Sequence, residues 1–369
     1  VSRKPIQTRE DLSLVYTPGV AEPCRAIAAD YGKSFALTRR SNLVAVITDG
    51  SAVLGLGNIG PAAGMPVMEG KCVLFKEFAG VDAFPICVDT QDTDKLVETI
   101  YLISKSFGGI NLEDISAPRC FEVERRLKER CDIPVFHDDQ HGTAIVVAAA
   151  MRNAMKVTGK QMGQMKIVIN GAGAAGIAIG KLLISMGFGN IVLCDINGIL
   201  CEGDESLNAE QQEIARISNC GHERGSLADA MKGADAFVGV SRPNLVSPEM
   251  VASMNRGIVF AMANPTPEIM PDEAKKAGAA VVGTGRSDFP NQINNVLVFP
   301  GIFKGALAVR AREITSEMQI RAVEALAAQV KEQELNPENI LPSALEKSIA
   351  DAVAQAVADE ARKQGIARI

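Results

Sequence analysis

The sequence predicts an α/β protein of two domains, the second of which contains a doubly wound parallel sheet. Three observations lead to this prediction. The 369 residues are about twice the length of a usual domain. Short apolar runs alternate with helix-like segments, and a glycine-rich turn joins one such run to a helix. We expect the domains to cover residues 1–139 and 140–369, with the last helices packing back on the body of the protein.

The first domain mixes strand-like and helix-like segments. Apolar runs that end at turn residues predict buried strands over residues 43–47, 73–75, 83–88 and 133–136. Helical periodicity predicts helices over residues 93–107 and 120–130. Together these segments predict an α/β domain.

The second domain alternates more regularly. Predicted helices cover residues 143–157 and 174–186, and predicted strands cover residues 166–169, 190–194, 235–239 and 258–261. After Gly305 the chain is almost entirely helix-forming, with interruptions only near Asn336 and Pro342. Regular alternation of this kind is the sign of a parallel, doubly wound sheet.

Composition excludes several classes of protein. The formal charge of −6 argues against nucleic acid as a partner, because nucleic-acid-binding proteins normally present a basic face. No apolar run approaches the ~20 residues that span a membrane, and the first residues lack the apolar core of a signal peptide. The eight cysteines are scattered and form no CxxC pair, so we expect reduced thiols in a cytoplasmic protein.

A glycine-rich turn separates the strand predicted over 166–169 from the helix predicted over 174–186. It has the spacing GxGxxG, formed by Gly171, Ala172, Gly173, Ala174, Ala175 and Gly176. In this context the motif is typical of a Rossmann-type dinucleotide-binding domain, because the turn brings backbone N–H groups and a helix N-terminus to the pyrophosphate. A glycine-rich turn without a ligand is the alternative.

Asp195 follows the next predicted strand, 19 residues after Gly176. A carboxylate at this point accepts hydrogen bonds from the adenosine ribose and repels the 2'-phosphate of NADP. Neither Ile196 nor Asn197 brings a compensating cation. We therefore expect NAD as the cofactor, with NADP as the alternative. A capping or solvated role for Asp195 is also open on the motif alone.

Acidic residues cluster at two places near the end of the first domain. Glu113 and Asp114 are adjacent, and Asp138 and Asp139 follow the strand predicted over 133–136. Carboxylate oxygens suit hard cations such as Mg²⁺ and Mn²⁺. The residues alone leave this open, because either aspartate of the second pair could cap the following helix. Zinc has little support, since the neighbouring histidines have no cysteine or glutamate at zinc-ligand spacing.

A series of motifs, spread over nearly the whole chain, occurs in the order of a known family. They are YTPGVA at 16–21, TDG at 48–50, LGLGNIG at 54–60, GMP at 64–66, GK at 70–71, NLED at 111–114, HDDQHGT at 137–143, ANPT at 263–266, NNV at 294–296 and FPG at 299–301. By these motifs the chain resembles a malic enzyme of the short prokaryotic type. So many motifs in one order make coincidence implausible.

The resemblance implies oxidative decarboxylation of L-malate to pyruvate and CO₂, with reduction of NAD or NADP and a divalent cation, Mg²⁺ or Mn²⁺. The family's metal ligands match Glu113, Asp114 and Asp139. In this chemistry the cation polarises the C2 oxygen and stabilises the enolate left when CO₂ departs.

Four further residues match family positions that act on the substrate. Lys71 matches the general base that takes the proton of the C2 hydroxyl, and Tyr16 matches the general acid that protonates C3. Asn264 and Asn295 match the asparagines that contact substrate and nicotinamide. We expect burial and a nearby cation to lower the pKa of Lys71. Taken singly, each residue has a simpler interpretation as a surface lysine, a turn residue or a cap.

One position departs from the larger eukaryotic members of the family. Where those proteins carry an arginine that binds a malate carboxylate, this chain has Ala52. We expect backbone N–H groups of residues 55–60 to bind that carboxylate instead. Members of the family associate as dimers, so we also expect a homodimer, with the segment around Tyr16 at the subunit interface.

Two other functions are kept as alternatives. A metal-independent 2-hydroxy acid dehydrogenase needs a catalytic histidine–carboxylate pair, which the three histidines, His137, His141 and His222, support only weakly. A dinucleotide-binding regulatory module would keep the glycine-rich turn but would not need Lys71, Tyr16 or the carboxylates.

Overall fold

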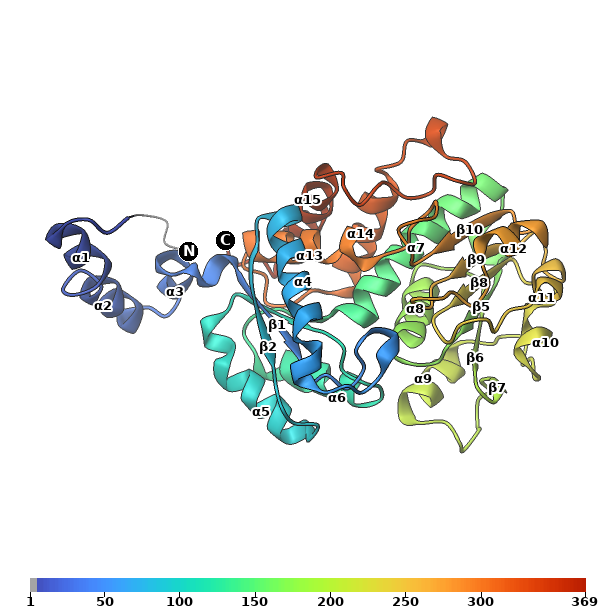
Figure 1. Ribbon diagram of the computed structural model, residues 1–369, viewed down its shortest axis with the longest axis horizontal. Helices are drawn as coiled ribbons and strands as arrows, with labels where there is room; N and C mark the ends of the chain where they lie inside the picture. Colours follow the sequence, from blue (N-terminus) through green and yellow to red (C-terminus); the bar gives the residue numbers. More distant parts are fainter. Residues whose placement is uncertain (1–4) are drawn as a thin grey trace.

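The computed structural model describes residues 5–369, and its two sheets follow one another along the longest axis of the molecule (Figure 1). The first sheet has the order β2-β1-β3-β4, with β1 (Leu43–Thr48), β2 (Asp82–Cys87), β3 (Gly109–Leu112) and β4 (Val135–His137). All of its strands are parallel. It forms the core of the predicted first domain.

The second sheet has the order β10-β9-β8-β5-β6-β7. Its strands are β5 (Lys166–Asn170), β6 (Asn190–Asp195), β7 (Gly198–Ile199), β8 (Ala236–Gly239), β9 (Ile258–Ala261) and β10 (Val281–Thr284). Only β7 is antiparallel to its neighbour. From β5 the chain builds the sheet first to one side and then to the other, so the predicted doubly wound parallel sheet is confirmed.

Helices connect the strands of both sheets. The first sheet is joined by α4 (Pro61–Ala79), α5 (Thr93–Ile103) and α6 (Arg119–Arg130). The second is joined by α8 (Ala174–Ser185), α9 (Ala209–Ile217), α10 (Leu227–Met231), α11 (Pro248–Ala252) and α12 (Pro271–Lys276). Single-turn helices are η1 (Arg39–Asn42), η2 (Leu54–Leu56), η3 (Ser104–Ser106), η4 (Met162–Gln164), η5 (Asn295–Leu297) and η6 (Glu332–Glu334).

Two sequence predictions in the first domain need correction. The strand predicted over 73–75 is wrong, because these residues continue α4. Its buried side chains Met68, Lys71 and Phe75 recur at helical spacing. Conversely, β3 was not predicted, because its four residues contain Gly109 and Asn111 and resemble the stop of the preceding helix.

A long central helix, α7 (Asp138–Thr158), leads from the first sheet to the second and buries 13 of its 21 residues. The sequence predicted a start near residue 143, but the helix begins five residues earlier, directly after β4. The predicted division between residues 139 and 140 thus falls in its first turn, and stays a prediction. Helix α14 (Ser316–Ala327) packs beside it, and α15 (Ser348–Lys363) packs against α14 and α13 (Phe299–Ala308).

The last helices also pack on the first domain. Phe75 of α4 meets Phe299 and Phe303 of α13 edge-on, with ring centroids 4.7 and 5.4 Å apart. Phe136 of β4 adds a third ring against Phe303, at 5.9 Å. Because one apolar core spans residues of both sheets and the C-terminal helices, we expect the two sheets to hold a defined relative position.

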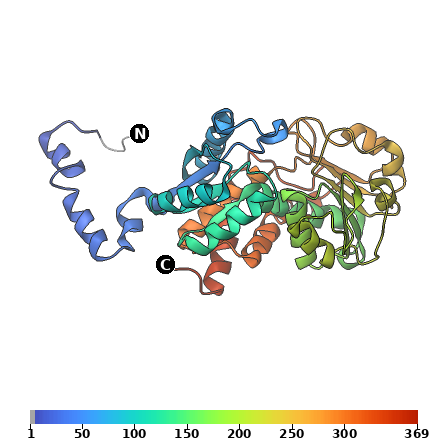
Figure 2. The ribbon, with the colours of Figure 1, turned by 90° about the horizontal axis from the view of Figure 1, so that it is seen from below.

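The N-terminal segment is arranged differently. Helices α1 (Arg9–Val15) and α2 (Ala21–Ala29) bury none of their residues, and α3 (Lys33–Leu37) joins them to the body. Figures 1 and 2 show α1 and α2 projecting from the end of the molecule opposite the second sheet. Apolar side chains on this arm are exposed, namely Ile6, Leu12, Leu14, Val15 and Tyr16. Among the described residues, no helix is long and apolar enough to cross a membrane.

The aromatic cluster gives a test of the packing between α4 and α13. We expect Phe75→Ala to lower the free energy of unfolding by about 3–5 kcal/mol, because it removes a fully buried ring and leaves a cavity. Leu102→Ala on α5, where the side chain is 67% exposed, should change it by less than about 0.5 kcal/mol. Urea unfolding measures both, and equal midpoints for the two variants would contradict the packing described here.

Candidate active site

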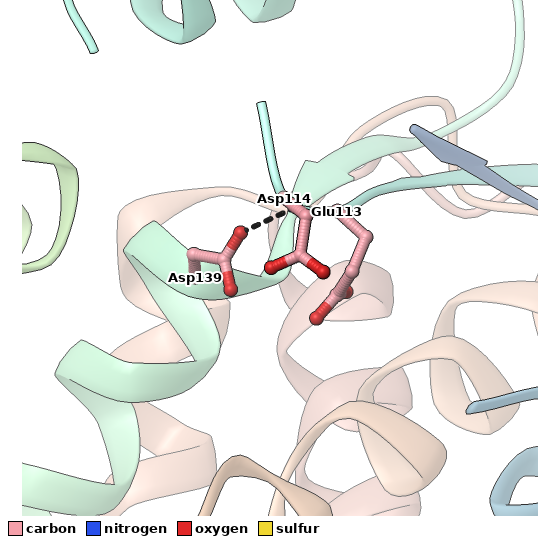
Figure 3. A group of neighbouring side chains, drawn as sticks. All are labelled: Glu113, Asp114 and Asp139. Carbon is pink, nitrogen blue, oxygen red and sulfur yellow. Dashed lines mark hydrogen bonds between the residues drawn. The ribbon is translucent and has the colours of Figure 1, made fainter. Parts of the chain in front are cut away.

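The first group of site residues is a cluster of three carboxylates. Glu113 and Asp114 directly follow β3, and Asp139 lies in the first turn of α7, so parallel strands bring them to the same edge of the sheet. One oxygen from each lies within 4.8 Å of the others. The backbone N–H of Asp114 donates to Asp139 Oδ2 at 2.8 Å (Figure 3).

The cluster is built as a cation site rather than as a surface patch. Asp114 has a φ of 53°, a conformation that side chains other than glycine rarely adopt. Its Oδ2 is buried and has no hydrogen-bond partner. Burial, and then the charges of Asp139 and Glu113, raise the pKa of Asp114 to about 8. Such an all-oxygen set with an unpartnered oxygen fits Mg²⁺ or Mn²⁺.

Lys71 lies beside this cluster on α4 and is buried. Its Nζ donates to Glu113 Oε1 at 2.8 Å and also to Asp138 Oδ2, and it lies over the ring of Phe299. Burial lowers the pKa of Lys71, but the charges of Asp138, Glu113 and Asp139 outweigh it and raise that pKa above its ordinary value. Burial therefore does not bring this pKa below its ordinary value, and the lowering expected from a bound cation stays a prediction.

Asp138 has a role that the sequence analysis did not assign to it, as a partner of Lys71. Its carboxylate is completely buried against Lys71, and its Oδ1 has no partner. Burial raises the pKa of Asp138 to about 8, although the charge of Lys71 acts in the opposite direction. The capping role considered for Asp138 and Asp139 is wrong, because His137 holds the N-cap position and makes no capping bond through its side chain. The signal that could have indicated this role is the start of α7 directly after β4, which places Asp138 at the carboxyl end of a strand.

Two asparagines complete the lining of the same cleft, which has a volume of about 540 Å³. Asn264 follows β9, and Asn295 begins η5. The neighbouring Asn294 accepts a hydrogen bond from the N–H of Val296 and so takes the capping role considered for this pair. The structure thus brings Lys71, the three carboxylates and both predicted asparagines into one cleft.

The cleft offers few groups for a substrate carboxylate. Ala52 lines it in place of an arginine, and Lys71 is the only basic residue among the described residues of its lining. Of the loop expected to supply backbone N–H groups, residues 55–60, only Gly55 reaches the lining. The expectation that N–H groups of this loop bind the carboxylate therefore stays a prediction, with Gly55 as the candidate.

Tyr16 is not part of this cleft. It caps the C-terminus of α1, is 66% exposed, and belongs to the arm that points away from both sheets (Figure 2). The chain therefore does not bring its own Tyr16 to Lys71. The motif matched Tyr16 to the general acid. It could not predict the direction of the N-terminal arm, because helices α1 and α2 bury no residues against the rest of the chain.

A second cleft, of about 620 Å³, lies over the glycine-rich turn. Gly171 has a φ of 115°, and a Cβ at Gly176 would collide with the carbonyl oxygen of Gly171. Gly173 is open to the cleft and precedes the N-terminus of the 12-residue α8, where an anion is favoured. The structure thus gives this turn the geometry expected of a dinucleotide site.

Asp195 lines this second cleft, as predicted for a residue that meets the ribose. Its Oδ1 accepts the backbone N–H of Asn197 at 2.7 Å. The sequence analysis found no cation nearby, but Arg242 lines the same cleft and is exposed. Arg242 follows β8 and Asp195 ends β6, so the two residues share this cleft because of the order of the strands and not because they are close in the sequence.

The histidines lie elsewhere. Burial lowers the pKa of His137 to about 4, and His141 Nε2 pairs with Glu124 Oε1 at 2.8 Å. That pair lines a different cleft, beside Lys128 and Lys181. Among the described residues, the one cluster able to hold a metal consists of carboxylates alone. This arrangement favours neither zinc nor the metal-independent dehydrogenase.

Known proteins resemble the chain over its whole length. Family models for the malic enzyme N-terminal domain and the malic enzyme NAD-binding domain match residues 1–128 and 140–362. The bifunctional malic/malolactic enzyme of Bacillus subtilis is 57% identical, over 100% of this chain and 90% of the relative. The chain belongs to the malic enzyme family. The NAD-dependent malic enzyme of Geobacillus stearothermophilus is 55% identical, over 100% of this chain and 77% of the relative.

Solved structures agree with this membership. The malic enzyme of Pyrococcus horikoshii superposes with a TM-score of 0.95 at 49% identity, over 100% of this chain and 87% of that chain. Membership does not decide the dinucleotide. Two malic enzymes of Rhizobium meliloti, 47% and 48% identical over 99% of this chain and about half of each relative, are named NAD-dependent and NADP-dependent respectively.

The carboxylate cluster gives a direct test of cation binding. We expect Asp139→Asn to weaken Mn²⁺ binding at least tenfold, because it removes one of three clustered charges. Asp272→Asn, a change of an exposed aspartate on α12, is the matched control and should bind Mn²⁺ like the unmodified protein. Electron paramagnetic resonance measures free Mn²⁺ during titration. Unchanged affinity in Asp139→Asn would remove this residue from the cation site.

Proposed function

We propose that the protein catalyses the oxidative decarboxylation of L-malate to pyruvate and CO₂, with reduction of NAD and with Mg²⁺ or Mn²⁺ held by Glu113, Asp114 and Asp139. The observation that carries this proposal is the position of Lys71. Its buried ammonium group pairs with Asp138 and Glu113 at the edge of the carboxylate cluster, in one cleft with the asparagines and beside the dinucleotide cleft.

Lys71 is placed to act as the base in the oxidation step. In its neutral form the Nζ amine accepts the proton of the C2 hydroxyl and becomes an ammonium group, which Asp138 holds in position through a hydrogen bond. When bound, Mg²⁺ or Mn²⁺ supplies positive charge that stabilises negative charge on the substrate oxygens and offsets the field of the carboxylates at Lys71. The amides of Asn264 and Asn295 supply neutral donors, which suits a cleft that lacks an arginine.

The role of Lys71 is tested by its removal. We expect Lys71→Met to lower kcat for malate oxidation by ~10² or more, because the general base is lost. Steady-state NADH formation from malate measures this, with pyruvate determined as the product. Lys76→Met, on the same helix but 56% exposed at its side chain, is the control and should leave kcat unchanged. Malate oxidation by Lys71→Met at the rate of the unmodified protein would show that Lys71 is not the general base.

We further propose a homodimer in which the arm of one chain meets the body of the other. The arm exposes a group of apolar side chains and buries no residue of α1 or α2 within its own chain. Exposed apolar surface of this kind marks an interaction site, and twofold dimers are the commonest assembly. Docking on a second copy would also bring Tyr16 to a cleft, where its hydroxyl can protonate C3.

Subunit complementation tests this assembly. Tyr16→Phe and Lys71→Met are each expected to be nearly inactive. In mixed dimers, Tyr16 from one chain and Lys71 from the other would meet in one intact site, so we expect about half of the unmodified activity. Co-expression with two affinity tags isolates these dimers. If each chain used its own Tyr16, the mixed dimers would stay inactive.

The proposal of NAD over NADP rests on Asp195. With NADP, its carboxylate would meet a 2'-phosphate, and a like-charge pair 4 Å apart costs about 4 kcal/mol at an effective dielectric of ~20 before relaxation and screening. Arg242 in the same cleft reduces this penalty but also attracts the pyrophosphate, which both dinucleotides share. We therefore keep the expectation that NAD is preferred.

Kinetics with the two dinucleotides test the preference. We expect kcat/KM for NAD to exceed that for NADP by at least about tenfold, or ~1.4 kcal/mol. Asp195→Ser with Asn197→Arg should shift the preference towards NADP, because it exchanges a negative charge for a positive one. Arg242→Ala is the informative companion. A protein that prefers NADP, and loses this preference in Arg242→Ala, would contradict the proposal and assign the phosphate to Arg242.

The cysteines support a further proposal, that the protein works in the cytoplasm. All eight thiols are free in the structure. Proteins of reducing compartments keep their cysteines in this state, and burial raises the pKa of Cys120 and of Cys194 to about 12, which keeps them as unreactive thiols.

A further inference from the structure

Glu268 is a buried carboxylate whose hydrogen-bond partners line the two clefts, and the sequence analysis did not single it out. It stands in the loop between β9 and α12 and is 0% exposed. Among the described residues no basic side chain forms an ion pair with it. A buried charge without a counter-ion is costly, so hydrogen bonds must stabilise the carboxylate of Glu268.

Those bonds join two loops at neighbouring strand ends. Glu268 Oε1 accepts the backbone N–H of Ser241 at 2.9 Å and its hydroxyl at 3.3 Å. Glu268 Oε2 accepts the backbone N–H of Ala263 at 3.1 Å. Ser241 follows β8, and Ala263 follows β9 and directly precedes Asn264. One carboxylate therefore holds both loops through separate oxygens.

The network continues to the glycine-rich turn. Asn170, the last residue of β5 before Gly171, donates from Nδ2 to Ser241 Oγ at 2.7 Å. Space for the carboxylate exists only because β8 ends in a glycine, since a Cβ at Gly239 would collide with the carboxylate of Glu268. The hydrogen-bond network Asn170–Ser241–Glu268–Ala263 thus spans the carboxyl ends of three parallel strands.

The residues of this hydrogen-bond network line the two clefts of the site. Asn170 and Ser241 line the dinucleotide cleft, while Ser241 and Ala263 line the catalytic cleft together with Asn264. Hydride transfer requires the nicotinamide and C2 of the substrate to meet at short range, and small displacements are costly for such a step. A rigid link between the loops that hold the two reactants would serve this requirement.

We infer that Glu268 is a positioning residue for hydride transfer: its carboxylate fixes the loop of Asn264 relative to the loop that follows β8, and so sets the nicotinamide against the substrate. This inference rests on the proposed malate oxidation. Glu268 touches neither reactant and acts through the backbone N–H groups of Ser241 and Ala263.

The change Glu268→Gln tests this role with little change in volume. The new amide offers one oxygen and one NH₂ group, so one of the two loops would face a donor in place of an acceptor. We expect kcat for malate oxidation to fall at least tenfold and the Kd for NADH to rise about threefold. Decarboxylation of added oxaloacetate needs no hydride transfer and should fall less than about threefold.

Two further variants make the test specific. Glu273→Gln changes an exposed glutamate on α12 and should behave like the unmodified protein. Ser241→Ala keeps the backbone bond to Glu268 but loses the link to Asn170, so we expect it to weaken NADH binding more than it lowers kcat. If Glu268→Gln does not fold, unchanged NADH affinity in Ser241→Ala would overturn the inference.

A purely structural role predicts a different result. Glu268→Gln would then melt at a lower temperature while keeping its kcat and its Kd for NADH, and this outcome would overturn the inference. Failure of the proposed function is separable from it. If the unmodified protein binds NADH but does not oxidise malate, the proposed function falls, and the ratio of the two NADH dissociation constants still decides whether Glu268 positions the nucleotide loop.

Discussion

The ion pairs of Lys71 with Glu113 and Asp138 are the interaction on which the rest of the site depends. They join three elements, α4, the end of β3 and the start of α7, and their side chains are largely buried. A buried pair stays favourable only while both partners are present, and removal of one costs about 3–5 kcal/mol. Four carboxylates around one ammonium group also repel one another when ionised, and a bound cation would relieve this repulsion.

The two sheets place this charge cluster where a dinucleotide can reach it. Glu113 and Asp138 leave the carboxyl ends of strands in the first sheet, while Gly171, Ser241 and Asn264 leave those of the second. Ligands of open α/β sheets bind at such ends. Because α7 carries Asp139 at its start and packs against α8, which begins at the glycine-rich turn, helix packing connects the cation site with the dinucleotide site.

Local patterns predicted the parts of the fold that depend on neighbouring residues. The glycine-rich turn, the strand before it and Asp195 were found because spacing alone defines them, and the carboxylates because their motif is distinctive. The pairing of Asp138 with Lys71 was not predicted, because an acidic residue at a helix start normally suggests a cap. Arg242 and Glu268 meet their neighbours at the site only because of the order of the strands in the sheet, and a local sequence pattern does not contain that order. The pKa of Lys71 depends on three charges from two other elements, and a local pattern can indicate the residue but not these surroundings.

Lys71 and Asp138 are expected to act as one unit in the oxidation of malate. A double-mutant cycle tests it most directly, with kcat/KM measured for Lys71→Met, Asp138→Asn and the combination at saturating Mn²⁺. If the two residues act together, the double variant will be no slower than the slower single variant, because each change already removes the same function. If instead the two losses multiply, the residues act independently and the account of the buried ion pair is wrong.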